Sequence, residues 1–317
     1  MRYLLTIFFV FNISAIHAQL DTAFYLAPIP EWSNQTQEIE ISTPFPNAIV
    51  TVFNSDSSYY NQVALSQGVP NTIYLNTTAQ GLQSTYGAIS TQLGNQVLDR
   101  AALFVRSDRD IVLTQRVTQQ YNQDLLSAKG TRALGKLFLA GNQTKIVNAP
   151  PAGEAALGFI SFVAIENNTS VSVNLPPGIT DKNGDNIISC VLNKWQSYTV
   201  TLDEDEQFAG ASIISSKPIS VTTGANHVKQ NAGGPEQDGG MDQLVPQDLV
   251  GNEYVIARGL APASLDYLVI IPTDDNTNIS ANGSLVANKN KSEVFEYTLA
   301  GGPGSVGQIT EIFSDKP

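Results

Sequence analysis

The chain has 317 residues, of which 42% are hydrophobic and 15% are charged, and this is enough apolar material for two or three domains with hydrophobic cores. Its 17 basic and 29 acidic residues give a formal charge of −12, which disfavours nucleic acid and anionic membrane surfaces as partners. The composition also argues against a largely disordered chain.

Residues 1–18, "MRYLLTIFFVFNISAIHA", predict a secretory signal peptide. A lone basic residue, Arg2, precedes an apolar stretch that ends at Ala18, a small residue suited to cleavage. Asn12 and Ser14 interrupt the stretch, which is shorter than a membrane span requires. We therefore expect a mature chain that begins at Gln19, carries a charge of −13 after the loss of Arg2, is secreted or exposed at the cell surface, and does not insert into the membrane.

Strand patterns occur along the rest of the chain, and no segment has a sustained helical period. Three hairpins are predicted, at residues 37–54, 158–175 and 266–283, and the second places Val171 and Val173 in alternation with polar residues. Each hairpin is followed by a further strand, at residues 71–76, 196–202 or 295–300. The order of these elements is the same each time, which indicates an internal repeat.

A serine motif closes each copy of the repeat, in "FVRSDRDIVL", "SIISSKPISV" and "EIFSDKP". Ser107 and Ser215 are 108 residues apart, and Ser314 follows 99 residues later. Serine, aspartate and proline favour turns, so we interpret the motif as a structural corner, a turn between two strands. A loop that contacts a ligand is the alternative interpretation.

The spacing of about 100–110 residues matches the size of a small β-sandwich. We predict an all-β fold of tandem antiparallel β-sandwich-like units at residues 19–150, 151–260 and 261–317, the third of them incomplete. The segment after the second serine motif, Thr222 to Asp242, contains a glycine-rich insert, which we expect to be a structureless loop of about twenty residues. Such loops often carry function.

Few residues are candidates for chemistry. The mature chain has one histidine, His227, and one cysteine, Cys190, which excludes a zinc site built from His/Cys clusters within one chain. Cys190 lies among apolar residues, as expected for an inert core residue, with an intermolecular disulfide as the alternative. Asp181, Asn183 and Asp185 have the spacing of a calcium loop, but Asn186 and Leu192 replace its glycine and glutamate, so an ordinary turn is preferred and no metal or other cofactor is predicted.

Three stretches, "SSKPISVTTGANH", "MDQLVPQDLVGNEYV" and "VIIPTDDNTNI", together resemble the IgGFc-binding protein N-terminal domain family. The resemblance covers roughly residues 97–317. It implies an extracellular, non-catalytic recognition role and assigns no binding residue.

These observations predict a secreted or cell-surface binding or adhesion module that recognises an extracellular protein or glycan. If one region carries recognition, the insert is the candidate, with His227, Asp238 and Asp242 as polar contacts. A structural spacer within a larger surface protein is the first alternative. A carbohydrate-active enzyme is the second, because sequence spacing does not show which carboxylates face each other.

Overall fold

The computed structural model describes residues 20–30, 36–55, 60–75, 88–89, 94–118, 123–142, 157–202, 207–228, 238–258, 267–299 and 307–317. The predicted all-β class is confirmed: strands dominate this part of the chain, accompanied by two short 3-10 helices, η3 (Gly130–Ala133) and η4 (Gln247–Leu249). The expected signal peptide lies outside the described residues. No helix in the described ranges is long and apolar enough to cross a membrane.

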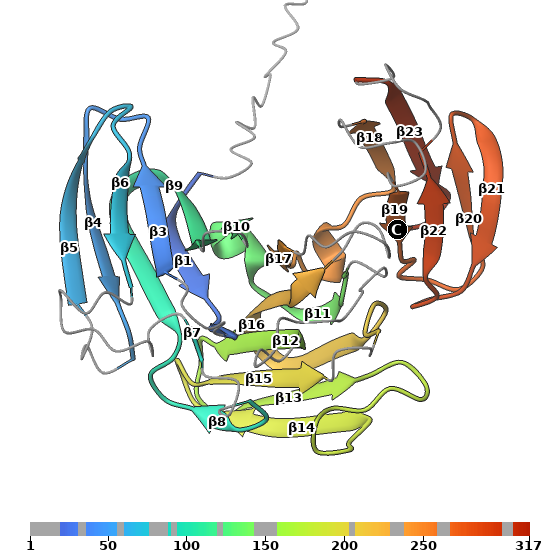
Figure 1. The fold of residues 1–317 in the computed structure, drawn as a ribbon, viewed down its shortest axis with the longest axis horizontal. Helices are drawn as coiled ribbons and strands as arrows, with labels where there is room; N and C mark the ends of the chain where they lie inside the picture. Colours follow the sequence, from blue (N-terminus) through green and yellow to red (C-terminus); the bar gives the residue numbers. More distant parts are fainter. Residues whose placement is uncertain are drawn as a thin grey trace, which may run out of the picture.

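The strands form three units that follow one another along an arc, with unit 2 in the middle (Figure 1). Unit 1 comprises β1 (Asp21–Leu26), β3 (Thr36–Ser42), β4 (Asn47–Phe53), β5 (Tyr60–Ser66), β6 (Asn71–Tyr74), β9 (Leu103–Thr118) and β10 (Gln123–Ser127). Unit 2 comprises β11 (Gly135–Leu139), β12 (Gly158–Ala164), β13 (Thr169–Asn174), β14 (Ile187–Leu192), β15 (Ser197–Leu202), β16 (Ser212–Val228) and β17 (Asp238–Gln243). Unit 3 comprises β18 (Glu253–Ala257), β19 (Tyr267–Ile270), β20 (Thr277–Ala281), β21 (Ser284–Lys289), β22 (Phe295–Thr298) and β23 (Ile309–Ser314).

Three very short strands lie outside this scheme. β2 (Ile29–Pro30) and β7 (Ala88–Ile89) form a parallel pair, and β8 (Val97–Leu98) joins the edge of the unit 2 sheet beside β15. A segment that lies just before β9 in the sequence therefore contributes to the sheet of unit 2.

The internal repeat is confirmed by the strand registers. Ser107 of β9 lies opposite Val50, Ser215 of β16 lies opposite Val171, and Ser314 of β23 lies opposite Ile279. The strand before each hairpin also pairs in the same register, since Phe24, Phe138 and Tyr254 lie opposite Val105, Ile213 and Ile312. Equivalent residues thus take equivalent places in all three units.

The serine motif is a corner, but the prediction that it is a turn between two strands is wrong. β9 and β16 run without a break through Ser107 and Ser215. What changes at the corner is the partner: the first half of β16 pairs with β13, and its second half pairs with β12 and β17. A single continuous strand therefore pairs with different strands before and after the corner.

Side chains of the motif hold this corner against the neighbouring hairpin. The side chain after the serine, Asp108, Ser216 or Asp315, accepts the backbone N–H of Ile49, Ser170 or Asn278, at 2.7, 2.9 and 2.8 Å respectively. The ammonium groups of Lys217 and Lys316 donate to backbone carbonyls in the hairpin turns, at Asn167 and Asp275. The motif is thus occupied by structural contacts, as the preferred interpretation requires.

Units 1 and 2 have closed cores, and aromatic rings fill the contact between them. The cores contain buried side chains from both halves of the long strands, such as Val105 and Leu113 in unit 1 and Ile213 and Val221 in unit 2. Between the units, the Trp195 ring stacks on that of Phe104 with the ring centroids 4.7 Å apart. Units 1 and 2 are therefore packed together by apolar contact.

Candidate functional site

A cavity of about 360 Å³ opens between unit 2 and unit 3. Its walls come from the segment that follows β17, from β18 and from β19 together with the residues after it. Apolar side chains line most of it: Leu139, Leu244, Val245, Val250, Ile256, Leu268, Val269, Ile270, Ile271, Ile279 and Ile312. We refer to this cavity as the cleft.

Two glycines allow the close backbone approaches beside the cleft. A Cβ atom on Gly135 would lie only 2.1 Å from the Pro246 Cβ, so glycine is needed where the segment before η4 packs on β11. Gly210 has a φ of +88°, and its added Cβ would lie 2.3 Å from the carbonyl oxygen of Ser292 in unit 3. A larger residue at either position would collide with these neighbours.

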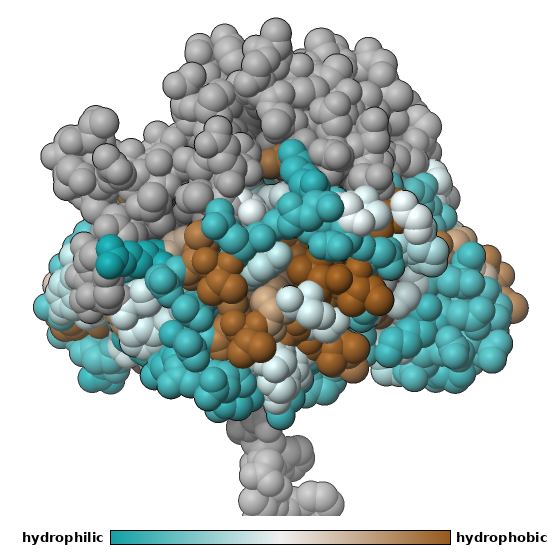
Figure 2. All heavy atoms as spheres, turned by 90° about the horizontal axis from the view of Figure 1, so that it is seen from below, coloured by the Kyte–Doolittle hydropathy of each residue, from teal (hydrophilic) through white to brown (hydrophobic). Residues whose placement is uncertain are grey.

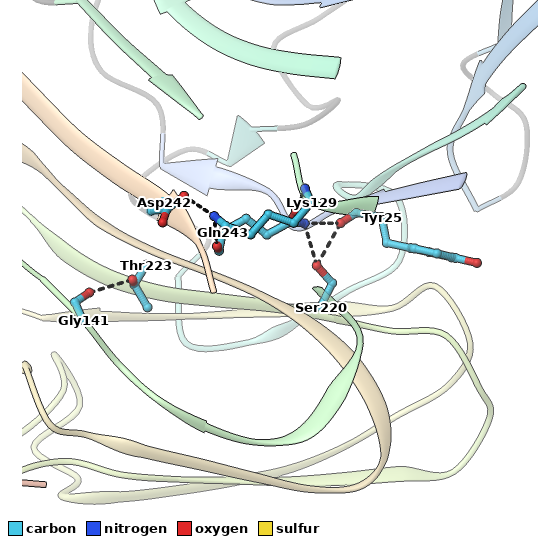
Figure 3. Close-up of polar contacts among 7 residues, drawn as sticks. All are labelled: Tyr25, Lys129, Gly141, Ser220, Thr223, Asp242 and Gln243. Atoms are coloured by element: carbon cyan, nitrogen blue, oxygen red, sulfur yellow. Dashed lines mark hydrogen bonds and ion pairs between the residues drawn. The ribbon is translucent and has the colours of Figure 1, made fainter. Parts of the chain in front are cut away.

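The polar end of the cleft is formed by Lys129, Asp242 and Gln243 (Figure 3). The Lys129 ammonium lies 2.5 Å from Asp242 Oδ1 and also donates to the Gln243 carbonyl. The Asp242 side chain is 64% exposed and that of Lys129 25%, so solvent screens the pair and it contributes about 0.2–1 kcal/mol. Its main effect is to hold a positive and a negative group at a fixed place on the rim.

Gln243 is 1% exposed, and its amide joins units 1 and 2 (Figure 3). Its Oε1 accepts the backbone N–H of Lys129 at 2.7 Å, and its Nε2 donates to the Tyr25 carbonyl and to Ser220 Oγ, both at 2.9 Å. Ser220 Oγ in turn donates to the Tyr25 carbonyl. Because every polar atom of this buried amide has a partner, the network fixes the wall of the cleft relative to unit 1.

Of the three predicted contact residues, Asp242 is the one whose side chain the structure describes. Asp242 lies in the cleft, opposite Thr223 in the β16–β17 ladder. His227 and Asp238 belong to the far end of that ladder, near the Val228–Asp238 pair, and their side chains lie outside the described set. The insert is also not structureless as expected, because its described residues are paired as β16 and β17; residues 229–237 lie outside the description.

Sequence reasoning missed Lys129, Gln243 and the apolar wall formed by β19. The only sequence signal for that wall was the apolar run "LVII" at residues 268–271, which was assigned to a hairpin strand. Nothing in a strand pattern shows that such a strand will line a cavity.

The calcium-loop candidate is occupied by turn contacts. Asp181 is buried, and its Oδ1 accepts the backbone N–H groups of Asn183 and Asp185, both at 2.9 Å. Its Oδ2 is buried and has no hydrogen-bond partner within the described residues. Across those residues, no group of three or more His, Cys, Asp or Glu side chains is placed to hold a metal ion.

Cys190 lies in β14 and packs against the unit 2 core as a free thiol. Burial raises its pKa to about 11, so the thiol stays protonated and unreactive at neutral pH. Burial also raises the pKa of the neighbouring Tyr198 hydroxyl to about 12, with smaller contributions from the negative charges of Cys190, Asp181 and Asp185. Neither group lines the cleft.

A second apolar surface lies on the outside of unit 2. Hydrophobic side chains gather in the middle of the face seen from below, among hydrophilic ones (Figure 2), and β8 and β14 lie lowest in Figure 1. The exposed large hydrophobic residues of these two strands and of β16 are Val97, Ile187, Val191 and Ile214.

The cleft lies within the part of the chain that matches a known protein family. The family model described as IgGFc binding protein matches residues 127–317, more than half of the chain and a shorter stretch than the sequence resemblance indicated. No curated protein and no solved structure matches the chain. All residues that line the cleft fall inside the matched range.

Proposed function

Because the chain belongs to the family described as IgGFc binding protein, we propose that it is a secreted or cell-surface, non-catalytic module that binds an extracellular protein or glycan through the cleft. The family is one of binding proteins, and the sequence begins with the pattern of a signal peptide. The partner is not identified by the family.

The cleft is the observation that carries this proposal. Sites for small molecules and cofactors are mostly apolar concave surfaces of about 300–1,000 Å³ with a small number of fixed polar groups. The cleft has this size and this composition, since Lys129 and Asp242 supply opposite charges at one end of an otherwise aliphatic wall. It also lies at the contact between two units, where ligand sites commonly occur.

The charge of the chain narrows the class of partner. At −12 overall, the protein repels phosphate-rich and strongly acidic molecules. We therefore expect a neutral or basic partner, bound by apolar contact in the cleft and oriented by the Lys129–Asp242 pair.

Adjacent residues of β18 provide a matched test. Ile256 lines the cleft, whereas Val255 points to the opposite face of the strand and is 64% exposed. The chain and its Ile256→Asp and Val255→Asp variants are probed against an array of extracellular proteins and glycans, with thermal melting as a check on folding. We expect Ile256→Asp to weaken binding at least tenfold, or about 1.4 kcal/mol, and Val255→Asp to bind normally.

The result decides between this proposal and the spacer alternative. One observation favours a spacer: the hydrogen bonds of the buried Gln243 amide fix the position of unit 1 relative to unit 2. If folded Ile256→Asp binds as well as the unmodified chain, or if no array partner binds either protein, the cleft is not a recognition site. Product analysis of the bound glycans distinguishes recognition from turnover.

A further inference from the structure

The connection between β13 and β14 is longer than the repeat requires. In unit 3 the equivalent strands, β20 and β21, are joined by two residues, Asn282 and Gly283. In unit 2 the connection comprises residues 175–186, which we call the β13–β14 loop. Because a two-residue turn is enough to close this hairpin, the added chain is expected to have a role of its own.

Hydrogen bonds hold the β13–β14 loop in a defined conformation. Asn186 Nδ2 donates to three backbone carbonyl groups of the loop, the nearest of them that of Ile179 at 2.7 Å. The backbone N–H of Lys182 donates to the Thr201 carbonyl of β15 at 3.0 Å. A ligand of the loop therefore meets groups that are already in place, which lowers the entropic cost of binding.

The loop contains a buried carboxylate with one unpartnered oxygen. Asp181 is 4% exposed, and its Oδ1 accepts the backbone N–H groups of Asn183 and Asp185. Its Oδ2 is buried without a hydrogen bond in the part of the chain that the structure describes, and no ion pair there includes Asp181. A buried charge without a partner is strongly unfavourable, so this oxygen needs a cation or a water molecule.

The two residues whose amides bond Asp181 also carry oxygen donors. The side chains of Asn183 and Asp185 are exposed and make no hydrogen bond of their own within the described residues. The pKa of the Tyr198 hydroxyl is raised to about 12, mainly by burial and then by the charges of Cys190, Asp181 and Asp185. The carboxylates of Asp181 and Asp185 therefore both lie within electrostatic reach of one hydroxyl group.

This donor set suits a calcium ion. Calcium binds carboxylate, amide and carbonyl oxygens in irregular geometries, whereas magnesium demands a nearly ideal octahedron. Two carboxylates are fewer than a tight calcium loop supplies, and Asn186 and Leu192 stand where such a loop has glycine and glutamate. The affinity should therefore be that of weak extracellular calcium modules, with a Kd of about 10⁻⁴–10⁻³ M.

We propose that Asp181 Oδ2 and the side chains of Asn183 and Asp185 bind a calcium ion in the β13–β14 loop. The ion neutralises the buried charge of Asp181, while Oδ1 keeps the two hydrogen bonds of the turn. No residue of the loop lines the cleft, so this site is independent of the proposed function.

Titration of the chelator-treated chain with calcium tests the proposal. Calorimetry should show saturable binding, and about 10 mM calcium should raise the melting temperature by at least about 3 °C. The amides of Asn183 and Asp185 should exchange at least about fivefold more slowly, with a much smaller effect of magnesium at the same concentration. If calcium changes neither melting nor exchange at these amides, water satisfies Oδ2 and the proposal is overturned.

Two exposed aspartates provide matched variants. Asp185→Asn removes a carboxylate of the site, and Asp248→Asn removes one from η4, outside the loop. Both remove one surface charge, so both variants should fold. Asp185→Asn should weaken calcium binding at least about tenfold, and Asp248→Asn should bind calcium as the unmodified chain does. Equal affinities of the two variants would show that the loop does not hold the ion.

A third variant tests the buried oxygen itself. Asp181→Asn keeps an oxygen for the two turn bonds but removes the charge and one ligand atom. It should lose the effect of calcium on melting while melting in chelator close to the unmodified chain. A calcium response that persists in folded Asp181→Asn would overturn the assignment of Oδ2. If this variant does not fold, the comparison of Asp185→Asn with Asp248→Asn decides.

Discussion

Units 2 and 3 share a corner, a hairpin and a register, yet they bury very different amounts of their strands. In unit 2 the long strand β16 continues past Ser215 and covers β12, whose residues are all buried. In unit 3, β23 reaches Ser314, and β19 and β18 stay half-buried or exposed. The fully buried apolar cluster of unit 3 consists of Ile279, Ala281 and Ile312, among the residues described.

The contacts between units differ in the same way. Trp195 and Phe104 close the contact between units 1 and 2, and Gln243 satisfies the buried polar groups there. The contact between units 2 and 3 contains the cleft. In unit 2, the half of β16 that lies beyond the corner covers β12 and completes the core.

The largest expected effect is the loss of stability when a core side chain is shortened, and it should differ between units 2 and 3. Phe162 is fully buried and stacks on Tyr198 with ring centroids 5.7 Å apart, so Phe162→Ala should lower the free energy of unfolding of unit 2 by about 3–5 kcal/mol. Its equivalent, Ile270, is half-buried, and Ile270→Ala should cost about 1–2 kcal/mol in unit 3. Native-state hydrogen exchange, read for each unit, measures both; equal losses would contradict the comparison.

An intermediate effect is expected at the joint between units 1 and 2. Gln243→Ala removes three hydrogen bonds and leaves the half-buried Lys129 N–H without its acceptor, which should cost about 1–3 kcal/mol. Gln62→Ala, which removes one exposed contact to Thr51, should change stability by less than about 0.5 kcal/mol. Urea unfolding of both variants checks this, and similar midpoints would show that the joint does not stabilise the fold.

The smallest expected effect is a pH dependence of the hydrogen bonds at the corner of unit 3. The corner of unit 2 should not show it. Hydrogen bonds from the Asn278 backbone and side chain, both at 2.8 Å, hold the pKa of the exposed Asp315 carboxyl below its ordinary value. Their stabilisation is present above the ordinary aspartate pKa of about 3.9 and is lost as the pH falls through the lower value of the folded protein. In unit 2, Ser216 accepts the equivalent bond from Ser170 and does not titrate.

Amide exchange between pH 5 and pH 2, corrected for its intrinsic pH dependence, provides the measurement. The Asn278 amide should lose protection in acid, and the Ser170 amide should not. In Asp315→Asn the pH dependence at Asn278 should disappear. A parallel response of both amides would show that the carboxylate is not its cause.

The sequence predicted the repeat because local chemistry recurs at each corner. Ser107, Ser215 and Ser314 marked equivalent places, and alternation at Val171 and Val173 gave the buried face of a hairpin correctly. The turn prediction failed because serine, aspartate and proline favour turns in isolation. Here Asp108, Ser216 and Asp315 bond the adjacent hairpin, and the strand bends without reversing.

The site was less predictable because it depends on contacts between distant segments. Asp242 was found through the unusual composition of its insert. Its partner Lys129 is 113 residues away along the chain, and no pattern in either segment indicates that they meet.

The unbroken path of β16 has a mechanical consequence. Large movements within proteins are absorbed by loops or by the ends of elements, which act as hinges. β16 carries no loop between the hairpin contacts at Ser215 and the β17 contacts at Thr222, and it is hydrogen-bonded to four other strands along its length. Tension applied at one end of unit 2 is therefore carried through the backbone of a single strand to β17, whose Asp242 and Gln243 line the cleft.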